Sequence, residues 1–202
     1  MKPLFKWTIA AAGAALLASC QTAPRRVAVA PPPPAPIELP YQWTQGNAEQ
    51  AHEDAVAAFG PLTMKPGEYK WVADIPAEGD AKVVIDRLQQ LFYVYRGDKL
   101  VGVATVSTGT KGRETPLGFW KVLTKKKLGY SRKYDNAPMP YMQMYDAKGI
   151  AFHAGPNPGY PASHGCVRLP KPFAEKLFGL TKVGTEVIIE GLRRASHAGG
   201  HG

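Results

Sequence analysis

The feature that most constrains the fold is a series of short apolar runs that begins after Gly79. Each run is rich in branched and aromatic residues, and turn residues such as Arg96, Gly97 and Asp98 separate one run from the next. Runs of this length and composition are typical of β-strands. The predicted strands are AKVVID, QQLFYVYRG, KLVGVATVSTG, GFWKVLT, GIAFHAG and GTEVIIEG, and FYVYRGDKLVGVATV predicts a hairpin.

Two segments favour helix. KPFAEKLFGL has Pro170 and Pro172 near its start and Gly179 near its end. The earlier segment NAEQAHEDAVAAF favours a short helix, which the glycine and prolines of GPLTMKPGEYKWV end. Short strands with one or two short helices predict a mainly β fold, a sandwich or barrel of about 110 residues.

The N-terminus has the pattern of an exported protein. Lys2 and Lys6 precede an apolar run over 9–17, which is too short to span a membrane and is followed by small residues. We therefore predict a signal peptide over 1–19. The ending LASC resembles a bacterial lipobox, which predicts lipid attachment at Cys20; the alternative is an ordinary secreted protein cut nearby.

The remaining boundaries follow from composition. Residues 20–40 would form the lipidated N-terminus and an extended, proline-rich linker. Residues 41–80 form an N-terminal extension of unknown role, which we expect to pack on the next domain through Tyr69 and Trp71. The main domain is predicted over 81–191, and residues 192–202 as a flexible tail.

The charge balance indicates which partners the chain meets. The formal net charge is +9, and removal of the predicted signal peptide leaves 23 basic and 16 acidic side chains. A basic protein outside the cytoplasm meets few nucleic acids, so we predict acidic wall polymers or lipid head groups as its partners. The alternative is that the lysines merely keep the surface solvated.

The second cysteine raises a question of chemistry. If Cys20 carries lipid, Cys166 has no partner in the chain, although the compartment is oxidising. Such a thiol is either buried and inert or kept for reaction. His153 ends a predicted strand, and the loop of glycines and prolines that follows could return the chain to the same rim. An imidazole there would help the thiol to ionise and attack.

Residues beside the cysteine add to this hypothesis. Gly165 permits unusual backbone angles, so the amides of His164, Gly165 and Cys166 could point at a developing oxyanion. Ser163 and Arg168 would orient the substrate, Arg168 by pairing with a carboxylate.

A zinc site made by His153, His164 and Cys166 is the competing interpretation. His164 and Cys166 stand only two positions apart, and the sequence offers no evident fourth ligand. We therefore predict no metal and no cofactor.

SHGCVRL with the upstream FHAG resembles the signature of the L,D-transpeptidase catalytic (YkuD-type) family. QQLFYVYRGDKLVGVATVSTG, TPLGFWKV and MPYMQMYDAKGIAFHAG are similar to successive strands and loops of that family in the same order, over about residues 81 to 190. The resemblance implies a mixed β-sandwich that carries a cysteine transpeptidase, which would make 81–191 its catalytic domain.

The resemblance also implies roles for single residues. Cys166 would be the nucleophile, His153 the proton donor and acceptor, and the backbone carbonyl of Ala154 would orient His153. His164 and Gly165 would form the oxyanion hole. Two residues of MPYMQM would line the acyl-donor groove, although ordinary strand packing explains them equally well: Tyr141 and Met142.

The implied substrates are a peptidoglycan tetrapeptide donor and an amine acceptor. The outcome would be 3→3 crosslinking, attachment of a lipoprotein or outer-membrane protein, or D-amino-acid exchange. The resemblance and the lipobox together place the protein in the periplasm, lipid-anchored to the outer or inner membrane of a Gram-negative bacterium. The alternatives are a related cysteine hydrolase or carboxypeptidase and a non-catalytic wall-binding lipoprotein.

Overall fold

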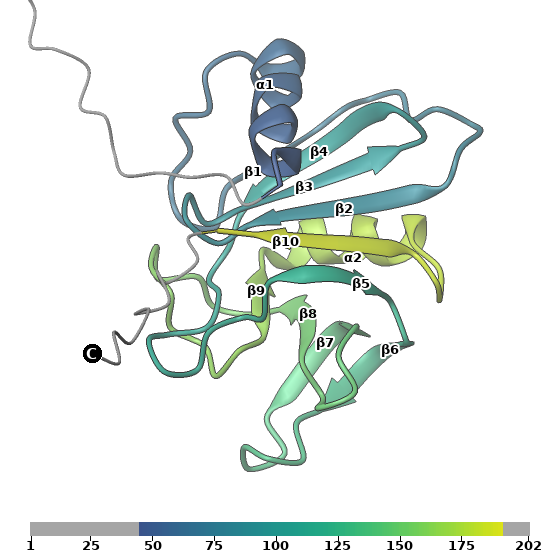
Figure 1. Cartoon of the computed structure of the whole chain (residues 1–202). Coiled ribbons are helices and arrows are strands. Elements are labelled where there is room, and N and C mark those ends of the chain that lie inside the picture. Colours follow the sequence, from purple (N-terminus) through teal and green to yellow (C-terminus); the bar gives the residue numbers. More distant parts are fainter. Residues whose placement is uncertain (1–44, 192–202) are drawn as a thin grey trace, which may run out of the picture. The chain divides into compact units, whose positions relative to one another are not determined.

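A computed structural model of the protein describes residues 45–191 (Figure 1). The predicted signal peptide, the lipidation site Cys20, the linker over 20–40 and the tail over 192–202 lie outside the described residues. Within 45–191, no helix is both long and apolar enough to cross a membrane.

Two sheets and two helices make up this region, which confirms the predicted mainly β fold. Sheet A has the order β1 (Tyr69–Trp71), β4 (Lys99–Thr105), β3 (Leu91–Arg96), β2 (Ala81–Asp86), β10 (Glu186–Glu190) and β5 (Gly118–Lys121). Sheet B has the order β6 (Thr124–Tyr130), β7 (Pro138–Met144), β8 (Ala151–Ala154) and β9 (Val167–Leu169). The helices are α1 (Asn47–Phe59) and α2 (Lys171–Leu180).

Sheet A is buried on both faces. Val83 and Ile85 of β2 belong to the main core, which also holds residues of sheet B and α2, whereas Val84 packs with the alanines of α1. Figure 1 shows α1 on one side of sheet A and α2 with β6 to β9 on the other. This two-sided burial explains why the predicted strands are nearly continuous apolar runs rather than alternating ones.

The strand pairing is mixed, as the resemblance implied. β3 and β4 form the predicted antiparallel hairpin, which turns at Gly97 and Asp98. β2 pairs in parallel with β10, so that Val83 lies opposite Val187. Sheet B contains a second parallel pair, β8 with β9.

The start of α1 is stabilised from the far end of the chain. The residue before the helix is Gly46, which has no side chain to cap it. The carboxylate of Glu190, at the end of β10, instead accepts hydrogen bonds from Asn47 Nδ2 and the Ala48 N–H, both at 2.8 Å. Glu190 is only 1% exposed. A buried negative charge therefore meets the positive end of the helix dipole.

The extension packs on the main domain as expected. β1 joins the edge of sheet A beside β4. The rings of Tyr69 and Trp71 lie 5.8 Å and 5.2 Å from the ring of Phe173 in α2. The side chain of Phe173 is completely buried. The predicted contacts through Tyr69 and Trp71 are thus confirmed.

Four of the ten described strands are not among the runs predicted as strands: β1, β6, β7 and β9. β7 overlaps MPYMQM, which the resemblance alone indicated. β6 is an edge strand with exposed lysines at 126 and 127, so it lacks the apolar content on which strand prediction depends. β9 has only three residues. β6, β7 and β9 belong to sheet B, the sheet that carries the candidate site, whereas β1 belongs to sheet A.

Candidate functional site

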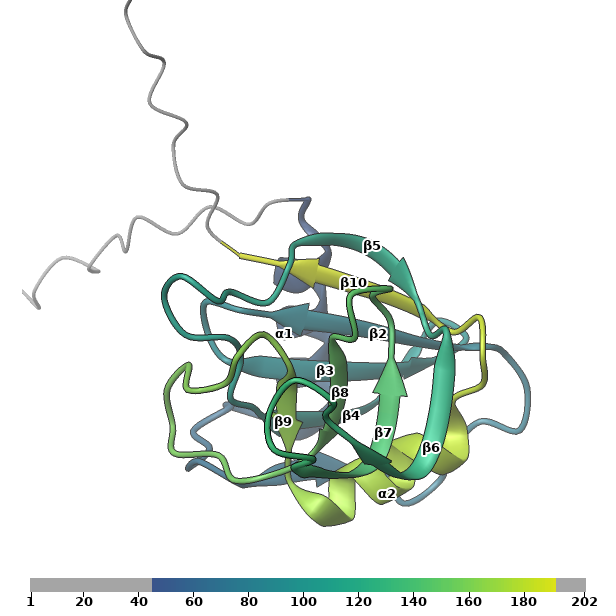
Figure 2. The ribbon, with the colours of Figure 1, turned by 90° about the horizontal axis from the view of Figure 1, so that it is seen from below.

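The parallel pair of β8 and β9 brings the two predicted reactive residues to one face of sheet B. His153 lies in β8, and Cys166 directly precedes β9, where Val167 pairs with Phe152. Phe152 and Val167 both point into the main core. Because neighbouring residues of a strand alternate in direction, His153 and Cys166 both point to the opposite face. Figure 2 shows β8 and β9 side by side, in front of sheet A.

The environment of His153 favours a neutral imidazole with a defined tautomer. Its Nδ1 lies 2.9 Å from the carbonyl oxygen of Ala154, so the contact implied for these two residues is present. A carbonyl oxygen only accepts, hence Nδ1 carries the proton and Nε2 keeps its lone pair. Burial lowers the pKa of His153, and the charge of Arg168 lowers it further, whereas the bond to Ala154 raises it. The result is a pKa below the ordinary one.

Cys166 is a half-buried free thiol. It packs against a small apolar cluster formed by Met139, Met142, Met144 and Ala151. Burial raises the pKa of the Cys166 thiol, although a hydrogen bond with the backbone of Ala151 and the charge of Arg168 both oppose this shift. Near neutral pH the imidazole and the thiol therefore both favour their uncharged forms, and a nucleophilic role for this thiol would require a base.

The turn before Cys166 corrects the predicted role of Ser163. Ser163 is 2% exposed, so it is not available to a substrate. Its hydroxyl donates to the carbonyl of Cys166 and accepts from the N–H of Gly165 at 3.0 Å. Ser163 therefore stabilises the turn through two hydrogen bonds of its hydroxyl to backbone groups of the turn.

The same contact corrects the prediction for Gly165. Its N–H is already bonded to Ser163, so it does not point at an oxyanion. Gly165 has φ +118, a conformation that a side chain would strain, and its value to the turn is this backbone freedom. Within residues 45–191, no hydrogen bond uses the N–H of His164 or of Cys166. These two amides are the donors that remain for an oxyanion.

Thr115 joins this turn to the loop that follows β4. Its Oγ1 accepts from the Gly109 N–H at 2.9 Å and donates to the Gly165 carbonyl at 2.8 Å. Gly109 also forms a bridge with Ser163. The sequence shows a threonine between loops and gives no sign that its hydroxyl reaches a residue fifty positions later.

Arg168 supplies positive charge at the site. It lies opposite His153 in the sheet register and is half-buried. The single ion pair among the described residues joins Lys182 to Asp80, so Arg168 has no carboxylate partner there. A guanidinium without an acidic partner among the described residues is chemically suited to a carboxylate, and the substrate-binding role of Arg168 stays a prediction.

His164 and the two predicted groove residues lie in different surroundings. The exposed ring of His164 stacks on Tyr134, with centroids 4.2 Å apart. Met142 belongs to the apolar cluster that touches the thiol. Tyr141 has φ +56, its ring lies 5.9 Å from Phe178 of α2, and a hydrogen bond to Glu175 raises its pKa. The structure thus places Met142 in the cluster against which Cys166 packs, and it places Tyr141 against α2. The contact with Tyr134 was not predicted, and its loop carries no motif that would have indicated it.

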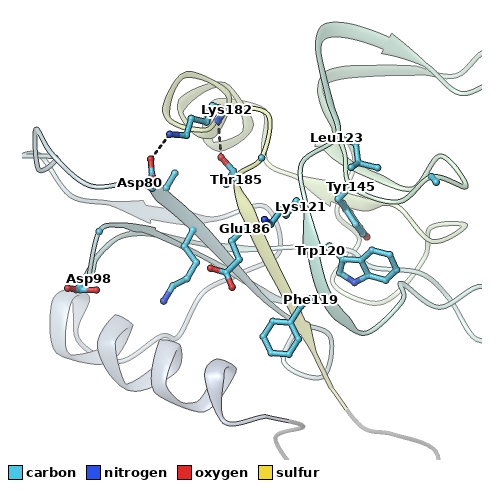
Figure 3. Close-up of a pocket in the computed structure, with 15 residues that line it drawn as sticks. Asp80, Asp98, Phe119, Trp120, Lys121, Leu123, Tyr145, Lys182, Thr185 and Glu186 are labelled. Carbon is cyan, nitrogen blue, oxygen red and sulfur yellow. Dashed lines mark hydrogen bonds and ion pairs between the residues drawn. The ribbon is translucent and has the colours of Figure 1, made fainter.

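A large cavity lies elsewhere. It has a volume of about 1050 Å³ and occupies the end of sheet A where β2, β5 and β10 meet the turn after β3. Figure 3 shows Phe119, Trp120 and Tyr145 in its wall, together with the ion pair of Lys182 and Asp80. None of the predicted site residues lines this cavity.

The comparisons with known proteins agree with this architecture. The family model of the L,D-transpeptidase catalytic domain (YkuD) matches residues 80–189. No curated protein matches the chain.

Solved structures share the fold. An L,D-transpeptidase from Stackebrandtia nassauensis is similar with a TM-score of 0.53 and 25% identity, over 71% of this chain and 67% of that one. An L,D-transpeptidase from Mycobacterium tuberculosis H37Rv has a TM-score of 0.50 and 22% sequence identity, over 54% of this chain and 57% of that one. An L,D-transpeptidase from Mycobacterium smegmatis has a TM-score of 0.51 and 20% sequence identity, over 55% of this chain and 58% of that one. The chain spans less than two thirds of either mycobacterial structure.

Proposed function

Because the chain belongs to the L,D-transpeptidase catalytic domain family, we propose that it is a cysteine-dependent transpeptidase of peptidoglycan stem peptides. The observation that carries this proposal is the placement of Cys166 and His153 on one face of sheet B, with Nδ1 of His153 held by Ala154. A base with a free Nε2 on the strand beside a thiol is the arrangement that nucleophilic catalysis by cysteine requires.

The first step is acylation. Nε2 of His153 takes the thiol proton as the sulfur of Cys166 attacks the carbonyl of the L-residue that precedes the terminal D-alanine. A sulfur–carbon bond forms, and the carbonyl electrons move to oxygen, where the free backbone amides of the turn stabilise them. The carbon–nitrogen bond then breaks. D-alanine leaves with the proton from His153, and a thioester remains on Cys166.

The second step transfers the acyl group. His153 accepts a proton from the incoming amine as the amine nitrogen bonds to the carbonyl carbon. The sulfur–carbon bond then breaks, and His153 returns the proton to the sulfur of Cys166. The side-chain amine of diaminopimelate in a second stem peptide would give a 3→3 crosslink. The lysine of a lipoprotein or outer-membrane protein would give wall attachment, and a D-amino acid would give exchange. Arg168 supports this substrate class, because its guanidinium forms no ion pair with another residue of 45–191 and can hold a carboxylate of the stem peptide.

We place this reaction in the periplasm, with the protein lipid-anchored at Cys20 to the outer or inner membrane of a Gram-negative bacterium. This part of the proposal depends on the N-terminal sequence alone, namely the lysines, the apolar run and LASC.

The decisive experiment incubates the purified protein with disaccharide tetrapeptide and follows the products by mass spectrometry. A crosslinked dimer supports transpeptidation. Tripeptide alone would favour the cysteine hydrolase or carboxypeptidase, in which water replaces the amine. Unchanged substrate, with no adduct of a carbapenem on Cys166, would leave only a wall-binding role.

Two variants test the assigned roles. Cys166→Ala should abolish every product while the circular dichroism spectrum stays that of the parent. His153→Ala should slow acylation by about 100-fold, within the usual range for loss of a general base. A variant without Cys166 that still forms product would show that another nucleophile acts.

A further inference from the structure

The starting point is the buried hydroxyl of Thr115. The residue is 0% exposed, and its hydroxyl connects the loop after β4 to the turn that carries the nucleophile. It accepts from Gly109 and donates to the carbonyl of Gly165, so both the lone pair and the proton are used. Valine has nearly the same shape as threonine and could make neither bond.

The bond to Gly165 fixes the direction of the next amide. The carbonyl of Gly165 and the N–H of Cys166 belong to one peptide unit, and no cis peptide occurs among the described residues. In a planar trans peptide these two groups point in opposite directions. Because the carbonyl points at the interior hydroxyl of Thr115, the N–H of Cys166 points away from it. The hydrogen bonds of residues 45–191 do not use that N–H.

The peptide groups on either side of this one are held by a different hydroxyl. On one side the N–H of Gly165 is bonded to the Ser163 hydroxyl, and on the other the carbonyl of Cys166 accepts from that same hydroxyl. The hydroxyl of Thr115 holds the unit between these two bonds. Loss of the threonine hydroxyl would release the one anchor of the peptide that ends in the Cys166 amide.

We propose that Thr115 is a positioning residue, which aims the backbone N–H of Cys166 at the oxyanion formed during acylation. The inference rests on the proposed function, because only attack on a carbonyl creates that oxyanion. Thr115 touches neither substrate nor reacting atoms and acts through the peptide of Gly165 and Cys166. Removing an oxyanion donor outright costs about 100- to 1000-fold in rate, and a donor left in place but poorly aimed should cost about 10- to 100-fold.

The experiment compares two reactions of the same thiol in the full-length protein. In acylation by a carbapenem, sulfur bonds to the lactam carbon, an oxyanion forms, and the ring carbon–nitrogen bond opens as nitrogen takes the proton. In alkylation by iodoacetamide, sulfur bonds to the methylene carbon and iodide leaves, so no oxyanion forms. Both rates are measured by intact-protein mass spectrometry on the parent, Thr115→Val and Thr115→Ser.

The expected result separates the two reactions. Thr115→Val should slow acylation by about 10- to 100-fold, while its alkylation rate stays within about twofold of the parent. Thr115→Ser keeps the hydroxyl and should react at close to the parent rates in both assays. If Thr115→Val does not fold, Thr115→Ala replaces it, with a smaller expected loss because a water can occupy the space left by the side chain.

A matched control removes a comparable hydroxyl away from the site. Thr181 is 6% exposed, and its hydroxyl oxygen lies 2.6 Å from Gln143 Oε1 and 2.8 Å from the Leu177 carbonyl oxygen, the two acceptors that its one proton can reach. Thr181→Val therefore loses two buried contacts as well, and it should leave the ratio of acylation to alkylation unchanged.

Three outcomes would count against the inference. Acylation of Thr115→Val at the parent rate would overturn it, as would an equal loss in acylation and alkylation, since that marks general damage to the turn. A parent protein that is alkylated but never acylated by carbapenem or tetrapeptide would instead refute the proposed function, and the oxyanion role of Thr115 with it.

Discussion

The carboxylate of Glu190 gives the sharpest test of how this fold is held together. It is 1% exposed and accepts two hydrogen bonds of 2.8 Å at the first turn of α1. Hydrogen bonds to a charged group contribute about 1.5–3 kcal/mol each, and the helix dipole adds about 0.3–1 kcal/mol. Removing the carboxylate also relieves the cost of burying a charge, which offsets part of this loss.

We therefore expect Glu190→Ala to lower the free energy of unfolding by about 3 kcal/mol. Glu190→Gln keeps the shape and one acceptor but loses the charge, so it should cost about 1–2 kcal/mol. Glu53→Ala removes an exposed carboxylate from the same helix and should change stability by less than about 0.5 kcal/mol.

Urea unfolding followed by circular dichroism measures these differences, provided that the m-value, the slope of the free energy of unfolding against urea concentration, is the same in all variants. Hydrogen exchange gives a second view, because the amides at the start of α1 should lose protection in Glu190→Ala while those of β3 keep theirs. If Glu190→Ala were no less stable than Glu53→Ala, water would be replacing the carboxylate at no cost, and the assigned cap would be wrong.

Three further predictions concern the site and the core. Because the pKa of His153 is lowered, the acylation rate should rise with pH through a midpoint below the ordinary value of 6.5. The rate should then stay level until thiolate forms above about pH 9. A midpoint above 6.5 in the pH–rate profile would contradict this prediction. Arg168→Gln should raise KM for tetrapeptide about tenfold and move that midpoint upward, because its charge lowers the pKa of His153; steady-state kinetics at several pH values test both effects. Phe173→Ala should lower the free energy of unfolding, measured in urea, by about 3–5 kcal/mol, and alanine in place of the half-buried Phe178 should lower it by less than half as much. Equal losses would contradict the central role of Phe173.

The parts of the fold that the sequence could predict are those where burial leaves a local pattern. β2 and β3 are covered on both faces, so they appear as uninterrupted apolar runs. The nearness of His153 and Cys166 could be predicted from the loop of glycines and prolines between them, whereas their reactive role stays a proposal. Their geometry needed only that one loop return to the neighbouring strand.

The parts that could not be predicted depend on contacts between distant segments. Ser163 looked like a substrate ligand, but its hydroxyl turns back to its own turn. Gly165 looked like an oxyanion donor, and that same hydroxyl takes its N–H. The cap on α1 comes from a residue 142 positions away. No local propensity records a partner of this kind.

The position of β10 has a consequence for how the chain reaches its native state. β10 lies between β2 and β5 and pairs with both, yet it is the last strand in sequence. Closing a loop of about a hundred residues is slow, and the chain gains little stability before it closes. Synthesis from the N-terminus therefore leaves sheet A without an inner strand until its final segment emerges. A chain truncated before Glu186 should stay unfolded, and Cys166 and His153 would then come together only in chains that include β10.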